Sequence, residues 1–360
     1  MAEPKKRHWL SRLSFGTISL VAAGLLVLAY LSVVIDPAKA WFFTLFGLLY
    51  PVVLPLTLIL WVWSLFRRSS MRGLLTLVLL PSLFFAGRYY NVLRHEPEQE
   101  ATLKVVSYNV GLFAHGPKGM DRKELADSVS RYLMGLDADI ICLQEFFLPS
   151  GTPLDYWLTR NFPGYRAEFY VRSGQSGHFG NLTLSRRGVT NRGKINFEHS
   201  TNMALWTDVK LENATVRLYN CHFESYNISF PALIKKDHAV EAVEETEQKM
   251  SRAITERPKQ VSAVLQDVEN APVRSLVLGD FNDTPLSYTY FRLLRGRKDS
   301  FVRAGHGFGS TYRTLWPLLR IDYILYPQEL NAVSYQVDKV KYSDHYPIIA
   351  TYYESGRDSQ

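Results

Sequence analysis

Cysteine is almost absent from this sequence, since Cys142 and Cys221 are the only two among 360 residues. Neither has the Cys/His spacing of a structural zinc site, which excludes that class of metal centre. Both lie in apolar, β-branched runs, where we expect strands and therefore buried free thiols. A disulfide between them stays open as an alternative, because it depends on a Cβ separation that a sequence does not give.

Clustered positive charge is also scarce outside the first hundred residues. The formal net charge is +7, but ten of the 41 basic and four of the 34 acidic residues fall within residues 1–99, which leaves 31 and 30 for the remainder. A nearly neutral remainder without a basic stripe gives no indication of a nucleic-acid-binding surface. The sequence also lacks internal repeats and low-complexity segments.

Charge is missing altogether from two long apolar runs, residues 13–35 and 40–66. Each is long enough for a helix that crosses about 30 Å of hydrocarbon. A third run, 73–93, contains Pro81 and reaches spanning length if the side chain of Arg88 extends to the membrane surface. We therefore predict that the first 95 residues form a membrane anchor with three transmembrane helices rather than a cleaved signal peptide.

The basic residues near these runs predict an orientation. Four precede the first run and three separate the second from the third, whereas the loop between the first two runs has one acid and one base. Loops rich in Lys and Arg tend to stay in the cytoplasm, which places the N-terminus there. Three crossings then put the rest of the chain on the other side. We expect an integral, multi-pass membrane protein with an extracytoplasmic domain, on the periplasmic or cell-surface side.

The chain after the anchor reads as one continuous domain. A polar linker at residues 96–102 is followed by a domain over 103–353 and a polar tail at 354–360. Strand-like runs dominate, and long helices are few. This composition favours two packed β-sheets flanked by helices over a doubly wound parallel sheet.

Three helices are expected within that domain. Apolar spacing predicts helices over residues 122–136 and 154–161. A long polar stretch, from about 231 to 268, predicts a third helix that is broken near Pro258. Its acidic face is interpreted as a solvated surface.

Six short polar segments carry the chemistry, and five of them lie at or near the end of an apolar strand run. They are SYN (107–109), LQE (143–145), CHF (221–223), GDFND (279–283), IDY (321–323) and SDH (343–345), of which SDH precedes the last run. Polar side chains at strand ends can face solvent from a rigid sheet. Carboxylates, amides and histidines presented in this way indicate a hydrolytic metal site.

Taken in this order, the six segments resemble the endonuclease/exonuclease/phosphatase superfamily, over nearly all of residues 103–353. That group includes pancreatic-type deoxyribonuclease, abasic-site endonucleases, inositol-polyphosphate 5-phosphatases and bacterial sphingomyelinases. The resemblance implies a four-layer α/β sandwich and hydrolysis of a phosphoester with a divalent metal. It does not identify the substrate, because one fold hosts many functions.

The resemblance also implies metal ligands. Glu145 is expected to be the principal one, since Mg²⁺ prefers carboxylate oxygen and keeps several waters. Asn109 is expected to orient Glu145, contact the metal or hold the phosphate. Asp344 resembles an additional carboxylate on the metal side. The expected cofactor is Mg²⁺, with Mn²⁺ as an alternative.

The GDFND segment is expected to activate water. Asp280 resembles the general base, and Asn282 would position the water or a phosphate oxygen, because residues two apart in an extended segment point to one side. Asp283 is interpreted as serving only the following turn, in which Thr284 caps a helix and Pro285 opens it.

Two histidines complete the expected site. His345 resembles the residue that polarises the phosphate, and Asp322 would orient it through the other ring nitrogen. His222 resembles the second histidine, which contacts the scissile phosphate or serves the leaving oxygen. For Asn181, a substrate contact and a strand-capping role remain equal alternatives.

The substrate class stays open. Abasic-site endonucleases have an acidic residue two positions after the first motif Asn, where this chain has Gly111, and this departure disfavours DNA repair. A nuclease-like phosphodiesterase is preferred, with nucleic acid as substrate. The alternatives are a lipid-headgroup phosphoesterase, with a phospholipid headgroup as substrate, and a catalytically silent binding module. The lipid bilayer is an expected partner, and no protein partner is evident.

Overall fold

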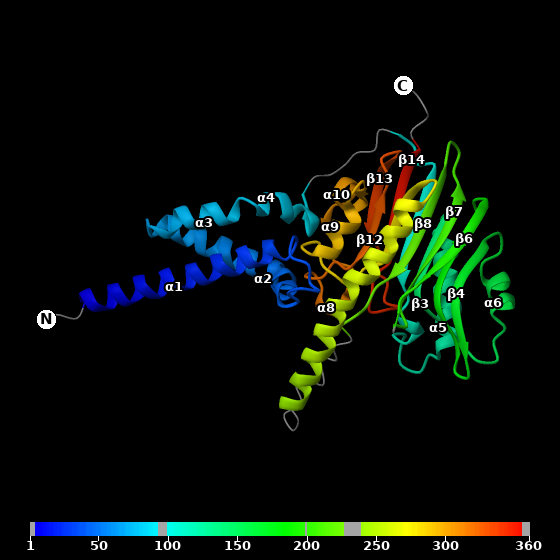
Figure 1. Cartoon of the computed structure of the whole chain (residues 1–360), viewed down its shortest axis with the longest axis horizontal. Coiled ribbons are helices and arrows are strands. Elements are labelled where there is room, and N and C mark those ends of the chain that lie inside the picture. The colour runs from blue at the N-terminus through cyan, green and yellow to red at the C-terminus, as the bar shows by residue number, and fades with distance from the viewer. Residues whose placement is uncertain (1–3, 93–98, 199, 227–238, 355–360) are drawn as a thin grey trace.

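The computed structural model describes residues 4–92, 99–198, 200–226 and 239–354. Figure 1 shows a helical part at the N-terminal end and a β-rich domain beside it. The predicted linker begins outside the described residues, and all of the predicted tail except its first residue also lies outside them.

Apolar sequence forms the N-terminal helical region (residues 4–89). Its elements are α1 (Pro4–Leu31), α2 (Phe42–Phe66), α3 (Met71–Leu79), α4 (Ser82–Phe85) and the 3-10 turn η1 (Ala86–Arg88). Three stretches are long and apolar enough to cross a membrane, and they are Ser14–Leu31, Phe42–Phe66 and Met71–Arg88. They match the three predicted runs in number and order. Pro81, which lacks a backbone N–H, lies between α3 and α4.

Two six-stranded sheets form the β-rich domain. The first, in spatial order, contains β13 (Leu330–Val337), β14 (Ile348–Glu354), β2 (Leu103–Asn109), β3 (Ile140–Pro149), β5 (Gly177–Ser185) and β4 (Arg166–Gly174). The second contains β10 (Lys298–Asp299), β12 (Asp322–Tyr326), β9 (Arg274–Asp280), β8 (Thr215–His222), β7 (Met203–Lys210) and β6 (Val189–Asn196). Both are mixed, with a parallel pair at the centre (β2–β3 and β8–β9) and antiparallel pairs on either side.

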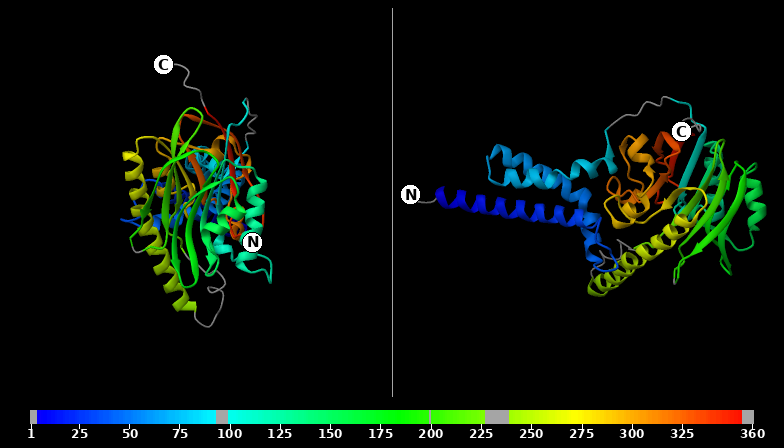
Figure 2. Two further views of the ribbon diagram at one scale, coloured as in Figure 1. Left: turned by 90° about the vertical axis from the view of Figure 1, so that its right-hand side faces the viewer. Right: turned by 45° about the horizontal axis from the view of Figure 1, so that its top comes forward.

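Helices cover the outer faces of the sheets. They are α5 (Arg122–Gly135) and α6 (Leu154–Asn161) on the first sheet, and α8 (Ala239–Asn270) and α9 (Tyr288–Leu294) on the second. The short helix α10 (Ser300–Ala304) instead adds Phe301 to the core between the sheets, and the 3-10 turns are η2 (Gly111–Phe113) and η4 (Arg313–Leu315). The left view of Figure 2 shows α8 and α5 on opposite sides of the paired sheets. The four-layer sandwich predicted from the sequence is confirmed.

Three hydrophobic layers hold these four structural layers together. In β2, Val105 packs between the sheets, whereas Val106 packs against the α5 side. In β3, Cys142 and Leu143 divide in the same way. Because both faces of each central strand are covered, apolar residues occur on both faces of these strands rather than on one face only. A third layer lies between the second sheet and helices α8 and α9.

Helix α8 differs from the prediction. The described helix runs without interruption from Ala239 to Asn270 with Pro258 inside it, so the predicted break near Pro258 is wrong. Residues 231–238, where the prediction began this helix, lie outside the described part. Packing explains the continuity, because buried side chains on both sides of the proline, Ile254 and Val261 among them, fix the helix. Tertiary contacts of this kind routinely override local propensity.

Both cysteines are buried free thiols, which was the preferred alternative. Cys142 is on the first sheet and Cys221 on the second. Burial raises the pKa of the Cys142 thiol to about 12. Both groups are therefore protonated and unreactive at neutral pH.

The helical region packs directly on the domain. A short ladder pairs β1 (Tyr90–Asn91) with β11 (Gly307–Phe308). Just before it, the ring of Phe85 packs edge-on against Phe291 of α9, with centroids 5.8 Å apart. The guanidinium of Arg320 donates to the backbone oxygen of Arg88 at 3.2 Å. These contacts fix the last turn of the helical region against the second sheet.

Candidate functional site

Sheet register brings the motif residues to one edge of the sandwich. The two parallel pairs end there, with Asn109 opposite Gln144 on β2–β3 and His222 opposite Asp280 on β8–β9. Strand β12 runs antiparallel to β9 and begins at the same edge, where Asp322 is the partner of Asp280. Because all four parallel strands point the same way, residues far apart in sequence meet at one place.

Asp280 lies at the centre of the cluster. Its Oδ2 lies 3.9 Å from His222 Nε2 and 3.7 Å from His345 Nε2. His222 Nε2 also lies 3.4 Å from Glu145 Oε1. The side chain of Glu145 is 27% exposed, whereas that of Asp280 is 1% exposed. The cluster therefore opens to solvent at Glu145 and is closed behind Asp280.

Amide groups hold the carboxylate of Asp280. Asn109 Nδ2 donates to its Oδ2 at 2.9 Å, and the backbone N–H of Asn282 donates to its Oδ1 at 2.8 Å. Asn282 Nδ2 adds a contact of 3.2 Å to Oδ2. Burial raises the pKa of Asp280 to about 6, against the lowering effect of His345. Such a carboxyl group can accept a proton near neutral pH.

Asp322 and His345 form a buried pair. His345 Nδ1 lies 2.9 Å from Asp322 Oδ2. Burial alone would lower the pKa of His345, but the carboxylates of Asp322 and Asp280 raise it well above its usual value. The ring is therefore held as an imidazolium whose Nε2 points toward Asp280, a placement suited to stabilising negative charge.

Two residues of the cluster have an unusual backbone conformation. Glu145 has φ of 49° and Asn282 has φ of 51°, in the left-handed region that residues other than glycine rarely adopt. Glu145 lies where the β3–β5 register shifts between Leu143 and Phe146. The bulge turns its carboxylate out of the ladder and toward His222. Strained conformations of this kind cost about 1–3 kcal/mol each and cluster at functional sites.

The side chain of Asn109 faces the carboxylates of the cluster through its amide nitrogen. Its Oδ1 accepts from the backbone N–H of Gly111 at 3.0 Å, and its Nδ2 donates to Glu145 Oε1 at 3.1 Å as well as to Asp280. A donor group therefore faces both carboxylates. Of the three roles expected for Asn109, orienting Glu145 fits this geometry, and ligation through its oxygen would require the amide to turn.

Asp344 is set apart from the cluster. Its Oδ1 lies 3.4 Å from His115 Nε2 and 3.2 Å from Ser343 Oγ. Within the described residues, it belongs to neither group of converging ligand atoms. Its assignment as a metal ligand remains a prediction, whereas Glu145, His222, Asp280, Asp322 and His345 are brought together.

Asn181 bridges the two sheets. It lies on β5 of the first sheet, and its Nδ2 donates to the backbone oxygens of Met203 (3.3 Å) and Asn220 (3.1 Å) on the second. This side chain is 1% exposed. This contact between the sheets is neither the substrate contact nor the strand-capping role expected from the sequence, and both of those stay predictions.

Asp283 has a larger structural role than expected. Its Oδ2 lies 3.2 Å from Arg257 Nη1 of α8, and both side chains are buried. The helix expected at Thr284 and Pro285 does not begin there, because α9 starts at Tyr288 with Ser287 as its capping residue. That part of the prediction is wrong, since burial of the segment outweighs the local Thr-Pro signal.

A buried amide network beneath the cluster was not predicted. Gln144 Nε2 donates to Asn220 Oδ1 at 2.8 Å, and Asn220 Nδ2 donates to the backbone oxygen of Leu182 at 3.0 Å. Both side chains are fully buried. It links the two sheets directly below Glu145 and His222. The sequence signal was present, because both residues are polar within apolar strands, with Gln144 inside the LQE segment and Asn220 next to the CHF segment.

The donor set of the cluster fits a hard divalent cation. Ligand atoms of Glu145, His222 and Asp280 lie within 4.8 Å of one another, and so do those of Asp280, Asp322 and His345. Carboxylate oxygen is the ligand that Mg²⁺ and Mn²⁺ prefer. His222 Nε2 is buried and forms no hydrogen bond within the described residues. The half-exposed Glu145 gives access from solvent.

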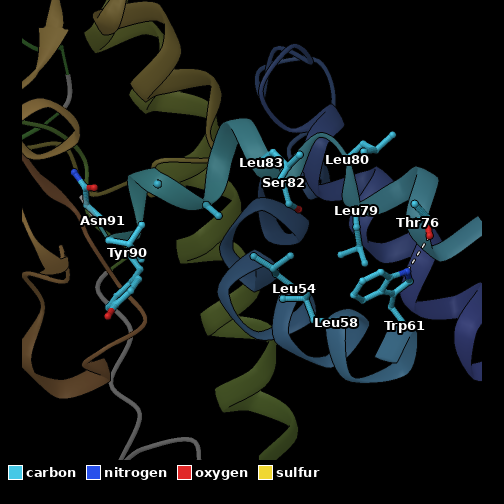
Figure 3. A pocket seen from close by; sticks show the side chains of 13 residues that line it. Leu54, Leu58, Trp61, Thr76, Leu79, Leu80, Ser82, Leu83, Tyr90 and Asn91 are labelled. Carbon is cyan, nitrogen blue, oxygen red and sulfur yellow. Dashed lines mark hydrogen bonds between the residues drawn. The ribbon is translucent and has the colours of Figure 1, made fainter. Parts of the chain in front are cut away.

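A separate apolar groove lies in the helical region. It has a volume of about 680 Å³ and lies between α2, α3, α4 and β1. Figure 3 shows Leu54, Leu58 and Leu79 facing into it, with the indole of Trp61 bonded to Thr76 at one side. None of the predicted site residues lines it. The polar chemistry of the domain and this groove are therefore distinct features.

Comparison with known proteins identifies the domain. A family model described as the Endonuclease/Exonuclease/phosphatase family matches residues 106–345. A second model, described as a domain of unknown function, matches residues 11–89. No curated protein matches the chain significantly.

Solved structures show the same fold. An endonuclease/exonuclease/phosphatase from Beutenbergia cavernae DSM 12333 is 17% identical, with a TM-score of 0.52 and coverage of 71% of this chain and 72% of that chain. One from Bacteroides vulgatus is 18% identical, with a TM-score of 0.51 and coverage of 70% and 98%. The human Nocturnin catalytic domain with bound sulfate anion is 16% identical, with a TM-score of 0.51 and coverage of 70% and 94%.

Proposed function

This chain belongs to the endonuclease/exonuclease/phosphatase family and is a phosphoester hydrolase, and from that premise we propose a divalent-metal-dependent reaction in which Asp280 activates the attacking water. The observation that carries the proposal is the convergence of His222 and His345 on the buried carboxylate of Asp280, with Glu145 next to His222. A buried carboxylate with a pKa of about 6 is suited to take a proton from water.

Glu145, the carboxylate of the cluster that solvent reaches, would hold the cation. A bound Mg²⁺ or Mn²⁺ would polarise a phosphoryl oxygen and neutralise its charge. Asn109 keeps the two carboxylates in place by donating to both. Asp344 would act on the metal side only after leaving His115.

The remaining residues orient Asp280 and act on the phosphoryl and leaving oxygens of the substrate. Asn282 fixes the orientation of Asp280 through two hydrogen bonds. His345, protonated and held by Asp322, would donate to a phosphoryl oxygen as negative charge develops there. His222 would serve the leaving oxygen, since its Nε2 is free of hydrogen bonds within the described residues.

The domain arrangement is part of the proposal. Residues 1–95 would anchor the protein in a membrane by three helices, and residues 103–353 would form the catalytic domain. The distribution of Lys and Arg supports an extracytoplasmic catalytic domain. The three apolar helical stretches support the anchor by length and composition.

A nuclease-like phosphodiester substrate is preferred, and a lipid headgroup is the alternative. The alternative is favoured by the packing of the domain on the helical region, which would hold the site near a bilayer. A silent binding module is disfavoured, because Glu145, Asp280 and His345 are all present and converge.

A substrate panel tests the proposal on the full-length protein in detergent. We expect hydrolysis of bis-p-nitrophenyl phosphate with Mg²⁺, its loss with chelator and its recovery with Mn²⁺. Asp280→Asn should lower turnover by about 10²–10⁴-fold. Plasmid DNA, RNA, sphingomyelin and phosphoinositides then separate the substrate classes. Hydrolysis that is indifferent both to chelator and to Asp280→Asn would contradict the proposal.

A further inference from the structure

The segment that follows Asp280 reaches from the catalytic cluster into the helical region. This motif loop (residues 281–287) joins β9 to α9 and has no helix or strand of its own. All seven of its residues are buried. An irregular segment that is buried along its whole length must be held by specific contacts, because its backbone groups need partners away from water.

The first half of the motif loop holds the proposed base. Asn282 binds both carboxylate oxygens of Asp280, and its Nδ2 also donates to the backbone oxygen of Phe223 at 2.9 Å. Its φ of 51° is maintained only while these partners stay in place. The orientation of Asp280 therefore depends on the path of this loop.

The middle of the loop is stiffened by the domain. Tyr323 Oη donates to the backbone oxygen of Asp283 at 2.8 Å. The carboxylate of Asp283 pairs with buried Arg257 and accepts from the backbone N–H of Thr284 at 3.0 Å. Few residues separate Leu286 from Asn282, and these contacts leave them little freedom to bend, so a displacement of Leu286 strains the segment that carries Asn282.

The far end of the loop belongs to the helical region. Leu286 is 0% exposed, and it is the only fully buried member of its hydrophobic cluster that comes from outside the helical region, within the described residues. Its buried partners are Ala23, Leu26, Ala29, Tyr50, Val53 and Val78. A leucine of the catalytic domain thus completes the core of the helical region.

Two small residues of the helical region seat Leu286. Ser32 Oγ lies 2.9 Å from the backbone oxygen of Leu286, to which it donates. Gly47 of α2 lies directly against the same oxygen, and a Cβ at position 47 would collide with it and with the Ser32 hydroxyl. The position of this carbonyl group therefore depends on Ser32, which follows α1, and on Gly47 of α2.

We propose that the helical region is part of the scaffold of the catalytic centre, with Ser32 and Gly47 as positioning residues that act on Asn282 and Asp280 through Leu286. The inference rests on the proposed function, in which Asp280 is the base. It predicts that substitutions confined to the helical region lower turnover although no residue of the catalytic domain is substituted.

A matched pair of glycine substitutions tests the proposal on the full-length protein in lipid nanodiscs. Gly47→Ala adds a methyl group against Leu286, whereas Gly24→Ala adds one where no atom lies within 4 Å. We expect Gly47→Ala to lower kcat by about ten- to hundredfold, the loss that a misplacement of about 1 Å can cause, with little change in KM. Gly24→Ala should match the wild type.

A second pair of substitutions removes side-chain atoms, and it tests the proposal even if Gly47→Ala does not fold. Leu286→Ala leaves a cavity in the hydrophobic cluster of the helical region, and Leu75→Ala makes the same change at a buried site outside this cluster. Leu286→Ala should lower kcat and Leu75→Ala should not. Leu286→Met, which refills the cavity, should restore most of the rate.

Amide hydrogen exchange separates this inference from the proposed function. Exchange in residues 281–287 should quicken in Gly47→Ala and Leu286→Ala but not in the two controls. Unchanged exchange, or faster exchange with wild-type kcat, overturns the inference. If the wild type hydrolyses no phosphoester, the proposed function fails, and exchange alone still decides whether the helical region holds the loop.

Discussion

At the scale of single residues, Glu145 is the carboxylate of the cluster that solvent reaches. Glu145→Gln keeps the shape but removes the charge that binds a hard cation. We expect the Mg²⁺ concentration for half-maximal activity to rise by at least about tenfold, with lower turnover and an unchanged melting temperature. Glu256→Gln, a change to a partly exposed carboxylate on α8, serves as control. An unchanged metal titration would remove Glu145 from the site.

The Asp322–His345 pair is expected to act as one unit. His345→Ala and Asp322→Asn should each lower kcat by about 10²–10³-fold and alter KM much less, because the charge they stabilise develops in the transition state. The double variant should be little worse than the poorer single variant. Steady-state kinetics of the four proteins measure this, and fully additive losses would show that the two residues act independently.

The two shifted pKa values predict a bell-shaped pH profile. Asp280 must be deprotonated to accept a proton, so kcat/KM should fall as pH drops below about 6. His345 must be protonated, and its pKa is raised, so the rate should fall only on the alkaline side. Asp322→Asn removes the carboxylate that contributes most to that rise and should shift the alkaline fall to lower pH. If the alkaline limb does not move, the protonated ring of His345 is not the group whose loss of a proton lowers the rate.

At the scale of elements, α8 is fastened to the motif loop by the Arg257–Asp283 pair. Breaking a buried ion pair leaves a charge without compensation, so Arg257→Met should lower the free energy of unfolding by about 3–5 kcal/mol. Lys259→Met, two residues away and exposed, should change it by less than about 0.5 kcal/mol. Denaturant unfolding compares the two, and similar values would contradict a structural role for Arg257.

Strand ends were predictable from sequence because their signal is local. Asp280, His222 and Glu145 each lie at or near the end of an apolar run. Such runs occur because both faces of these strands are buried. Cross-sheet partners were not predictable in the same way. Which carbonyl groups Asn181 meets depends on how two sheets stack, and no spacing along one strand encodes that.

Helix ends show the same division between local and tertiary signals. The bounds of α6 agree with the prediction residue for residue, and α5 does so to within one residue, because Asp121 and Glu124 form a capping box at its start. No helix begins at Thr284, where one was predicted, and α8 continues through Pro258, where a break was predicted. In both failures, burial against another element decides the structure.

At the scale of the whole molecule, the proposed topology has a direct test. With three crossings, an alkaline-phosphatase reporter fused after Glu100 should be active, and a fluorescent reporter that matures only in the cytosol should be dark there. Fusions after Ser70, in the basic loop, should give the reverse. Fluorescence after Glu100 would mean that the stretch Met71–Arg88 does not cross.

The position of β14 has a consequence for biosynthesis. This last strand lies between β13 and β2. Strand β2, the first of the domain to be made, can pair with β3 early, but it gains its second neighbour only when nearly the whole chain has been made. The nascent chain therefore carries an open edge on β2 throughout synthesis, and such edges invite aggregation. Ribosome stalling or premature termination before Ile348 would leave the first sheet open. The catalytic domain that carries Leu286 would then be incomplete. Such fragments should be substrates for chaperones and proteases rather than partly active enzymes.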